Sequence, residues 1–537
     1  MKHRSWIITG GFCFLAAAFV TLASIRAVDS RKSLYNQIQL FSTVLDRIKQ
    51  DYVEETDSET LLNSAIRGMV STLDPHTTFL AANQFERFSQ NYEGYSGIGI
   101  EFDIIRNKIT IMSIFENGPS DQVGLMTGDR IVAIDGKTAV GLKRDEVPLK
   151  LMGPKGSSVE VTVERTGWAR PKPYTLIRDE IHVKSVPYAF MLNNGIGYIG
   201  IIRFSSTTGR ELEDALRKLE GLGMKQLILD LRFNTGGYLE SAVDVVDRFL
   251  PGGKMIVYTK GRIQGSYREF FSTERNAHPI QPVIVLINRI SASASEIVAG
   301  ALQDWDRALV LGETSFGKGL VQSQYRFSDG SALLMTTARY YTPSGRLIQR
   351  SYSDKSSEEY YSEIADDSLR EQNDQDRSRP AFKTKILNRE VYGGGGITPD
   401  VFLTAKQDTF SPKIRELVFS SERPFYTFAE DYLKLHPEIK KDFNDFLWNF
   451  RLDPSALQRF LTTVRNLGLS LSSTEFTGNR EDIIFLIKQT LADMVWGDEA
   501  RQKITILRDR QLQESLSYFT RAEGLLTQAY SSHIKQG

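Results

Sequence analysis

The sequence has 537 residues, of which 41% are hydrophobic and 25% are charged, as in ordinary folded globular proteins, so a wholly disordered chain, a collagen and a polytopic membrane protein are excluded. Lysine and arginine total 66, as do aspartate and glutamate, and this zero formal charge gives no sign of a nucleic-acid partner. The single cysteine, Cys13, excludes an intrachain disulfide and cysteine-ligated zinc, and the scattered histidines form no His-Glu-x-x-His motif, so no metal site is expected.

An apolar run follows the basic first residues of the chain. It extends from Trp6 to about Ile25, about the 20 residues that a helix needs to span a bilayer, and the preceding basic residues favour a cytoplasmic N-terminus. A cleaved signal peptide is the alternative, although no Ala-x-Ala site immediately precedes Asp29. We therefore expect residues 1–28 to form a membrane anchor or signal segment. The rest would lie in the periplasm or another extracytoplasmic space, held at the inner membrane by this one anchor.

Residues 34–92 are predicted to be an N-terminal helical region. Leu40, Phe41 and Val44 recur at helical spacing, and Asp57 is placed to begin a second helix. Pro75 ends that helix, because proline disfavours helical backbone in the residue before it. The following histidine is then expected in a turn or cap rather than in catalysis.

Residues 93–180 form a small, mostly β module in this prediction. Short runs of alternating apolar residues are separated by glycine, proline and aspartate, which is typical of strands joined by turns. The predicted strands are 99–104, 108–114, 129–134 and 158–165, with short helices near 120–123 and 145–151.

Residues 181–405 have the pattern of an α/β core. Near-continuous apolar strands are typical of a buried parallel sheet, and the helices between them are the expected crossovers. The strands are predicted at 195–202, 226–231, 282–288 and 308–312, and the helices at 209–222, 239–249 and 291–304. Residues 353–381 are polar and predict an exposed insertion, and residues 411–537 predict a C-terminal helical region.

Three serines alternate with alanines where the third core strand leads into a helix. This segment, Ser291–Glu296, lies at the sheet edge where open α/β proteins bind ligands, and a helix N-terminus favours developing negative charge. A serine there can be a nucleophile or a simple helix cap. The α/β-hydrolase Gly-x-Ser-x-Gly motif is absent, so any base must come from elsewhere.

Lys318 is the candidate base, in the glycine-flanked segment Gly317–Gln322 after the next strand. To accept a proton near neutrality its pKa must fall from about 10.4 by roughly 3, at a cost of about 4 kcal/mol, which desolvation can supply. Gln322 is placed to orient the amine. The alternatives are a surface hairpin and a phosphate-binding loop, although the P-loop spacing fails at Gly319.

A third candidate element, Asp230–Gly237, ends the second core strand. Its paired glycines, Gly236 and Gly237, can direct a backbone N–H at an oxyanion, and Ala294 would supply the other donor. A plain strand-to-helix turn is the alternative. The three elements together, at the ends of consecutive strands, favour a catalytic site.

Together these three segments resemble the carboxyl-terminal processing peptidases, also called tail-specific proteases. The resemblance covers about residues 34–402 and implies a protease core similar to the Clp protease/crotonase fold. It assigns the nucleophile to Ser293, the base to Lys318 and its support to Gln322. It places the oxyanion donors at Gly236, less surely Gly237, and at Ala294.

The resemblance also implies that the module at 93–180 is a PDZ domain. The segment Gly97-Ile98-Gly99-Ile100 is similar to the PDZ loop that binds a C-terminal carboxylate. Many relatives carry an arginine just before a later Gly-x-x-Gly turn, whereas this sequence has Met152, so gating through that arginine is not implied here.

The expected function is an exported serine endopeptidase that recognises protein C-termini and uses a Ser–Lys dyad, with no metal or organic cofactor. Its partners would be protein or peptide substrates with accessible C-termini, and the C-terminal helices could serve a homo-oligomer or an adaptor. One alternative is an inactive, membrane-tethered PDZ adapter. Another is a crotonase-like enzyme acting on acyl-CoA, which leaves the PDZ-like module unexplained.

Overall fold

The computed structural model describes residues 34–534, apart from 116, 193–194, 275–277, 367–378 and 405–409. The predicted anchor at 1–28 lies outside the described residues. Within that described part of the chain, no helix combines the length and the apolar character needed to cross a bilayer. The chain divides into two compact units, residues 1–74 and 75–537.

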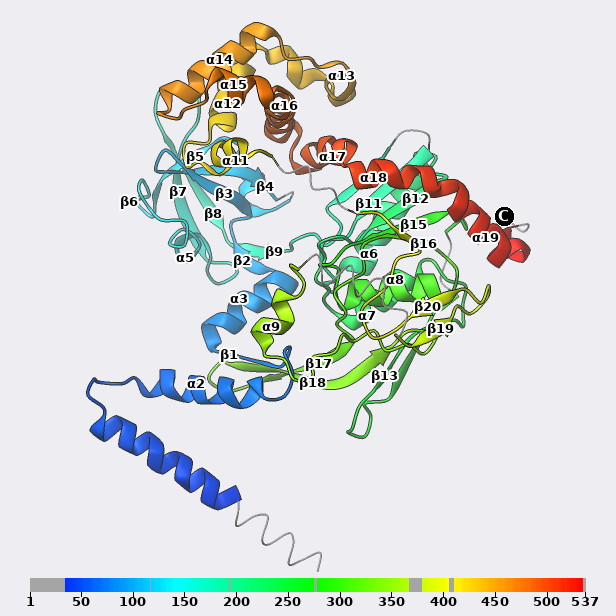
Figure 1. Ribbon diagram of the computed structural model, residues 1–537. Coiled ribbons are helices and arrows are strands. Elements are labelled where there is room, and N and C mark those ends of the chain that lie inside the picture. Colours follow the sequence, from blue (N-terminus) through cyan, green and yellow to red (C-terminus); the bar gives the residue numbers. More distant parts are fainter. Residues whose placement is uncertain are drawn as a thin grey trace, which may run out of the picture. The chain divides into compact units, whose positions relative to one another are not determined.

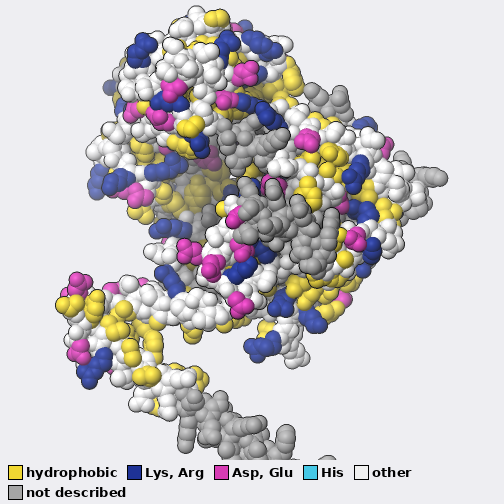
Figure 2. Space-filling model, in the orientation of Figure 1, with side chains coloured by type: hydrophobic (Ala, Val, Ile, Leu, Met, Phe, Trp, Pro, Cys, Tyr) yellow, Lys and Arg dark blue, Asp and Glu magenta, His cyan; other side chains and the backbone are white. Residues whose placement is uncertain are grey.

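The first unit contains two described helices, one over 34–51 and α2 (Ser58–Ser71). Asp57 caps α2 as predicted, because its carboxylate accepts the Thr60 N–H at 2.8 Å. The helix over 34–51 exposes apolar side chains, among them Leu40 and Phe41, and Figure 2 shows hydrophobic side chains along this part of the molecule. The apolar spacing thus marked a helix but not a buried face.

In the second unit, the predicted helical region contains a short strand as well. Strand β1 (Thr78–Leu80) pairs with a core strand, and α3 (Ala82–Glu93) follows it. Three residues are too few to show an alternating pattern, so the sequence did not mark this strand.

The β-rich module folds around its own apolar core. Its sheet has the order β3-β4-β5-β7-β8, with β6 on β5, and β3 at one edge. The strands are β3 (Ile100–Ile105), β4 (Lys108–Ile114), β5 (Arg130–Ile134), β6 (Lys137–Thr138), β7 (Ser158–Glu164) and β8 (Lys172–Ile177), with short helices α4 (Pro119–Gln122) and α5 (Pro148–Leu151). Strands β2 (Tyr95–Gly97) and β9 (Asp179–Ile181) pair separately.

The α/β core is built on a six-stranded sheet of order β10-β11-β12-β15-β16-β21, parallel except for β10 (Figure 1). Its strands are β10 (Tyr188–Met191), β11 (Ile196–Gly200), β12 (Gln226–Asp230), β15 (Val283–Ile287), β16 (Leu309–Gly312) and β21 (Val401–Phe402). The four central strands were predicted within a few residues, because each is a nearly unbroken apolar run between turns. The two edge strands are short and were missed.

Helices cover both faces of this sheet. Alternate side chains such as Leu229 and Val285 pack with helices α6 (Thr208–Gly221), α7 (Leu239–Asp247) and α8 (Ala294–Asp304). Those between them, such as Ile228 and Ile284, pack with side chains of α17 (Asp498–Arg508), α18 (Arg510–Ser515) and α19 (Phe519–Ile534). The end of the C-terminal helical region is therefore part of the core packing.

A second sheet of the core carries the order β1-β18-β13-β14, with β17 on β18. Its core strands are β13 (Met255–Lys260), β14 (Arg268–Phe271), β17 (Leu320–Arg326) and β18 (Ala332–Tyr341).

Within the polar segment predicted as an exposed insertion, α9 (Ser357–Ser362) has a fully buried Tyr360. This tyrosine packs against His76 and Phe316, and two adjacent tyrosines in a polar run gave no sequence signal of burial. A hairpin of β19 (Ala381–Lys383) and β20 (Glu390–Tyr392) follows.

The rest of the C-terminal region is helical, as predicted, with a separate cluster of buried apolar residues. It contains α11 (Pro412–Phe419), α12 (Pro424–Leu435), α13 (Phe443–Asn449), α14 (Pro454–Asn466), α15 (Ser473–Gly478) and α16 (Arg480–Trp496). The predicted aromatics Phe425, Phe428 and Phe446 lie in this cluster, which explains their density in the sequence.

Candidate active site

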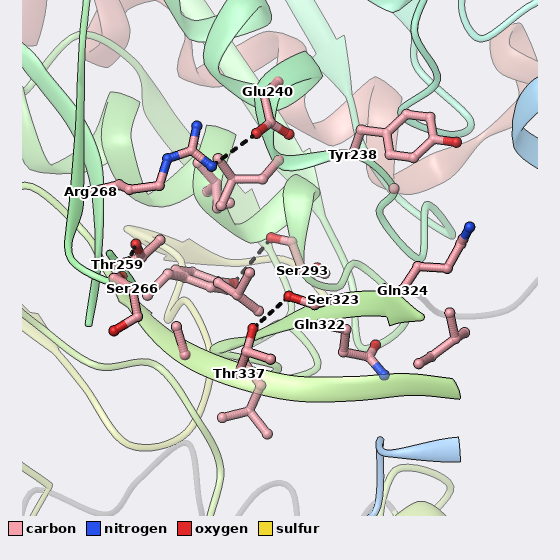
Figure 3. Close-up of a pocket in the computed structure, with 18 of the residues that line it drawn as sticks. Tyr238, Glu240, Thr259, Ser266, Arg268, Ser293, Gln322, Ser323, Gln324 and Thr337 are labelled. Atoms are coloured by element: carbon pink, nitrogen blue, oxygen red, sulfur yellow. Dashed lines mark hydrogen bonds and ion pairs between the residues drawn. The ribbon is translucent and has the colours of Figure 1, made fainter. Parts of the chain in front are cut away.

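A cavity of about 500 Å³ brings all three predicted elements together. It is lined by Thr235 and Gly237 of the turn after β12, by Ser293 at the start of α8, by Lys318, and by side chains from β17 and β18. Figure 3 shows Ser293 and Gln322 among the residues around this cavity. Side chains far apart in the sequence therefore share one site, as the three predicted segments required.

Ser293 has an unusual backbone. Its φ is +55° and its ψ is −111°, a conformation that residues with a side chain rarely adopt. Although it occupies the N-cap position of α8, its hydroxyl makes no capping hydrogen bond. Every residue of α8 is buried, so the helix holds this residue rigidly. Backbone strain at an unused hydroxyl in a cavity is typical of a functional residue.

The amine of Lys318 is oriented as predicted. Its Nζ donates to Gln322 Oε1 at 2.6 Å, and Gln322 Nε2 donates to the carbonyl oxygen of His76 at 2.7 Å. His76 is buried, and its ring contacts Phe316, Tyr360 and Tyr361. The histidine thus supports the glutamine through its backbone carbonyl oxygen.

Glu296 connects the backbones of the serine and the lysine. One carboxylate oxygen accepts the N–H of Ser293 at 2.7 Å and that of Lys318 at 2.9 Å. The other accepts the Gly317 N–H at 2.7 Å and the Ser315 hydroxyl at 2.6 Å. No motif in the sequence marks a role for this glutamate, although it ends the alternating serine run. It fixes the two reacting segments relative to each other.

Burial raises the pKa of Glu296 to about 7, and the four hydrogen bonds only partly oppose this rise. The carboxylate form is the one that can accept all four hydrogen bonds. Tyr340 adds a second connection, since its hydroxyl lies 2.7 Å from the Lys318 carbonyl oxygen and 3.1 Å from that of Ser293. The backbones of Ser293 and Lys318 are therefore linked through both their N–H and their C=O groups.

Glu296→Gln is expected to lower kcat about 10²-fold, because the amide leaves at least one buried N–H of this network without an acceptor, at about 1–3 kcal/mol each.

The raised pKa of Glu296 should also make the stability of the protein depend on pH. The folded pKa of about 7 exceeds the ordinary 4.5, so the native protein binds more protons, and its stability falls as the pH rises from 4.5 to 7. Thermal unfolding from pH 5 to 8 should show a smaller decline in Glu296→Gln than in the wild type. An equal decline in both proteins would contradict this assignment.

The turn after β12 lies against the serine segment. Asn234 joins the two, since its carbonyl oxygen accepts the Ala292 N–H at 3.0 Å and the Ser295 hydroxyl at 2.9 Å. Gly236 and Gly237 have φ of +102° and +151°. The Gly236 N–H donates to Asn234 Oδ1 at 2.8 Å, which the sequence analysis did not foresee. Gly236 lies next to Ser293, since an added Cβ there would be 2.8 Å from Ser293 Cβ, but the N–H of Gly236 already has a partner within the turn.

Gly236→Ala is expected to lower kcat at least about 10²-fold, because the added side chain would push Ser293 and the neighbouring turn apart and so disturb the backbone N–H groups that could bind an oxyanion. The new Cβ would lie 2.8 Å from both the Ala292 carbonyl oxygen and Ser293 Cβ, at a φ that disfavours any side chain. Steady-state kinetics on a peptide substrate measure the effect. Gly221→Ala is the matched control, because nothing lies within 4 Å of its added Cβ. Equal activity of the two variants would show that the close approach of Gly236 to Ser293 does not matter for catalysis.

The predicted PDZ loop lies at the start of β3. Ile98 and Ile100 are buried in the apolar core of the module, and Gly99 has a φ of +73°. Near this loop, Met152 ends α5, and the Arg178 side chain donates to the carbonyl oxygens of the last residues of this helix. Arg178, which directly follows β8, thus contacts the end of α5, and the sequence gave no sign of this contact.

Comparison with known proteins gives matches for three parts of this chain. Residues 195–354 match the model of peptidase family S41, residues 96–170 match a PDZ domain, and residues 18–84 match the N-terminal domain of the activating protease CtpB. The carboxy-terminal-processing protease of Bartonella bacilliformis is 37% identical over 341 residues, covering 63% of this chain and 78% of that protein. The chain belongs to peptidase family S41.

Other S41 relatives agree. The carboxy-terminal processing protease CtpB of Bacillus subtilis is 35% identical over 334 residues, covering 61% of this chain and 68% of that protein. A solved structure of a photosystem II D1 C-terminal processing protease is 29% identical, covers 57% of this chain and 83% of that one, and has a TM-score of 0.32. The family models and the two curated relatives show that this protein is a carboxy-terminal processing serine protease with a PDZ domain, and the family resemblance drawn from the sequence is confirmed.

Proposed function

We propose that this S41 protease cleaves peptide bonds through a Ser293–Lys318 dyad. The observation that carries the proposal is that both side chains line one cavity while Glu296 binds the backbone N–H of each. In the first step the uncharged Lys318 amine takes the proton of the Ser293 hydroxyl, and the oxygen attacks the peptide carbonyl. Gln322 accepts a hydrogen bond from the amine and keeps it directed.

The tetrahedral intermediate carries a negative oxygen next to the turn 234–237. The backbone N–H groups of Ala294 and the glycine turn are the proposed donors, with Gly237 favoured over Gly236 because the latter N–H is held by Asn234. The protonated lysine then gives its proton to the leaving amine, which leaves an acyl-enzyme on Ser293. Water, deprotonated by the same lysine, releases the acyl group and restores the hydroxyl.

Apolar side chains line much of the cavity, which favours substrates with apolar residues next to the cleaved bond. They are Leu239, Phe270, Ile297, Leu320, Leu334 and Ala338. The ion pair between Arg268 and Glu240 at the cavity is exposed and 3.5 Å long, so it contributes little to stability and can move for a substrate (Figure 3).

A serine-directed fluorophosphonate tests the enzyme mechanism against the adapter alternative. Mass spectrometry should find one adduct, on the peptide that contains Ser293, and none on a Ser293→Ala variant. Labelling elsewhere, or no labelling of a folded protein, would favour the adapter.

We propose further that the PDZ domain binds the C-terminal tails of substrates at the loop 97–100. Strand β3 lies at a sheet edge, so a tail can pair with it while the loop N–H groups bind the carboxylate. Amidating the C-terminus of a peptide substrate is expected to raise KM about tenfold, equivalent to about 1.4 kcal/mol. Acetylating its N-terminus is the control and should leave KM unchanged. Equal KM values for the free and the amidated peptide would count against tail recognition.

The protease is also proposed to work outside the cytoplasm, anchored in the inner membrane through residues 1–28. The apolar run and the basic residues before it support this. Alkaline extraction of membranes should leave the protein in the pellet, and protease added to spheroplasts should digest it. Release of the whole protein by alkaline wash would contradict an uncleaved anchor.

A further inference from the structure

Arg232 lies inside the turn that carries the proposed oxyanion donors, and its guanidinium is almost fully buried. The side chain is 7% exposed and forms paired hydrogen bonds with Asp230 at the end of β12, the shortest being 2.7 Å. The same guanidinium donates to Asp509 Oδ2 at 2.6 Å and to Gln511 Oε1 at 2.8 Å. These two partners come from the beginning of α18, more than two hundred residues later in the chain.

Asp509 and Gln511 are themselves firmly placed. The other carboxylate oxygen of Asp509 caps α18 by accepting the Leu512 N–H at 2.9 Å. Gln511 is 5% exposed, and its Nε2 donates to the Leu403 carbonyl oxygen at 2.6 Å. The end of the C-terminal helical region therefore presents a fixed acceptor pair to Arg232 rather than a chance surface contact.

Other hydrogen bonds also hold the backbone around Arg232, among them that of its own N–H to Asp230 Oδ1 at 3.0 Å. Leu231 accepts the Ser291 hydroxyl on its carbonyl oxygen at 2.8 Å, and the Phe233 N–H donates to Asn288 Oδ1 at 3.0 Å. Phe233 has a φ of +62°, which costs free energy for a residue with a side chain. Arg232 lies between these two contacts, so its guanidinium fixes the step from the strand into the strained part of the turn.

We propose that Asp509 and Gln511 are positioning residues of the protease, which act through Arg232 to hold the 230–237 turn in its oxyanion-binding form. This inference deepens the proposed function and rests on it. Loss of these contacts should let the turn relax, which weakens stabilisation of the tetrahedral intermediate while leaving substrate binding largely intact. The defect should therefore appear in kcat and not in KM.

The double variant Asp509→Ala/Gln511→Ala tests the proposal in the full-length protein. We expect kcat to fall at least about 30-fold, KM to stay within threefold, and fluorophosphonate labelling of Ser293 to slow in parallel. Asp509→Asn keeps one oxygen that can cap α18, and Gln511 still accepts from Arg232, so this variant should lose only three- to tenfold. It serves as the readout if the double variant does not fold.

The matched control is Glu499→Ala. Glu499 also joins the C-terminal helices to the core, through Lys218 at 3.2 Å, but both side chains are about half exposed and neither contacts the turn. This variant should keep wild-type kcat. A comparable loss in Glu499→Ala would show that the C-terminal helices act only through general stability, and would overturn the proposal.

A double-mutant cycle with Arg232→Met separates positioning from stability. If the two residues act through Arg232, adding their substitution to Arg232→Met should lower kcat no further. Wild-type kcat in the double variant, or additive losses in the cycle, would reject the inference. Wild-type protein that neither cleaves peptides nor labels at Ser293 would instead reject the proposed function, so the two failures can be told apart.

Discussion

Ser293→Ala is expected to lower kcat by about 10⁴- to 10⁶-fold, the range in which loss of a nucleophilic serine leaves only the contribution of binding and oxyanion stabilisation. The fold should persist, because the hydroxyl makes no capping bond and alanine keeps the same Cβ. Rates are measured on a fluorogenic peptide, and circular dichroism checks folding.

The neighbouring Ser295 supplies a control within the same motif. Its hydroxyl donates to the Asn234 carbonyl oxygen at 2.9 Å and is fully buried, so it supports the turn without facing the reaction. Ser295→Ala should cost about tenfold, the order of one neutral hydrogen bond. If Ser295→Ala lost as much as Ser293→Ala, or if the latter still cleaved at more than a trace rate, the nucleophile would be misassigned.

Lys318→Met is expected to lower kcat by about 10²- to 10⁴-fold, the usual contribution of a general base. Methionine keeps the length of the side chain, so the cavity should not collapse, while Gln322 loses the amine that donates to it at 2.6 Å. Because only acylation and deacylation need the base, peptide KM should change less than kcat.

Lys318→Arg sharpens this test, since a guanidinium can still donate to Gln322 but stays protonated at any accessible pH. It should be as inactive as the methionine variant. Lys383→Met changes an exposed lysine of the core and should be fully active. Activity retained by Lys318→Arg would mean that the residue acts as a fixed charge and not as a base.

Much of the fold could be predicted because the signals were local. The central strands of the core sheet are apolar runs of the right length, and Asp57 marked the start of α2 by a capping preference that acts over three residues. Strands β1 and β21 are three and two residues long, and they exist only because a long neighbouring strand or sheet edge pairs with them. Such pairing has no local signature.

The residues of the candidate site also differ in whether a local sequence motif marks them. Ser293, Lys318 and Gln322 could be proposed because each falls in a distinctive motif. The role of Glu296 depends on four hydrogen-bond donors from two separate segments. The role of Asp509 depends on its contact with Arg232, a residue far away in the sequence. Side chains that act by tertiary hydrogen bonding have no characteristic spacing, so the sequence indicated candidates for the reacting groups but not the groups that hold them.

The order of elements along the chain has a consequence for how this protease is made. Ile228 and Ile284, on one face of the catalytic sheet, are covered by helices that are synthesised after every catalytic motif. While the chain is still emerging, that face has no cover and Arg232 has neither Asp509 nor Gln511 beside it. The nascent chain therefore exposes apolar surface and is prone to aggregate. At that stage Ser293 is already present, but the contacts that would hold the turn at Arg232 are not yet made.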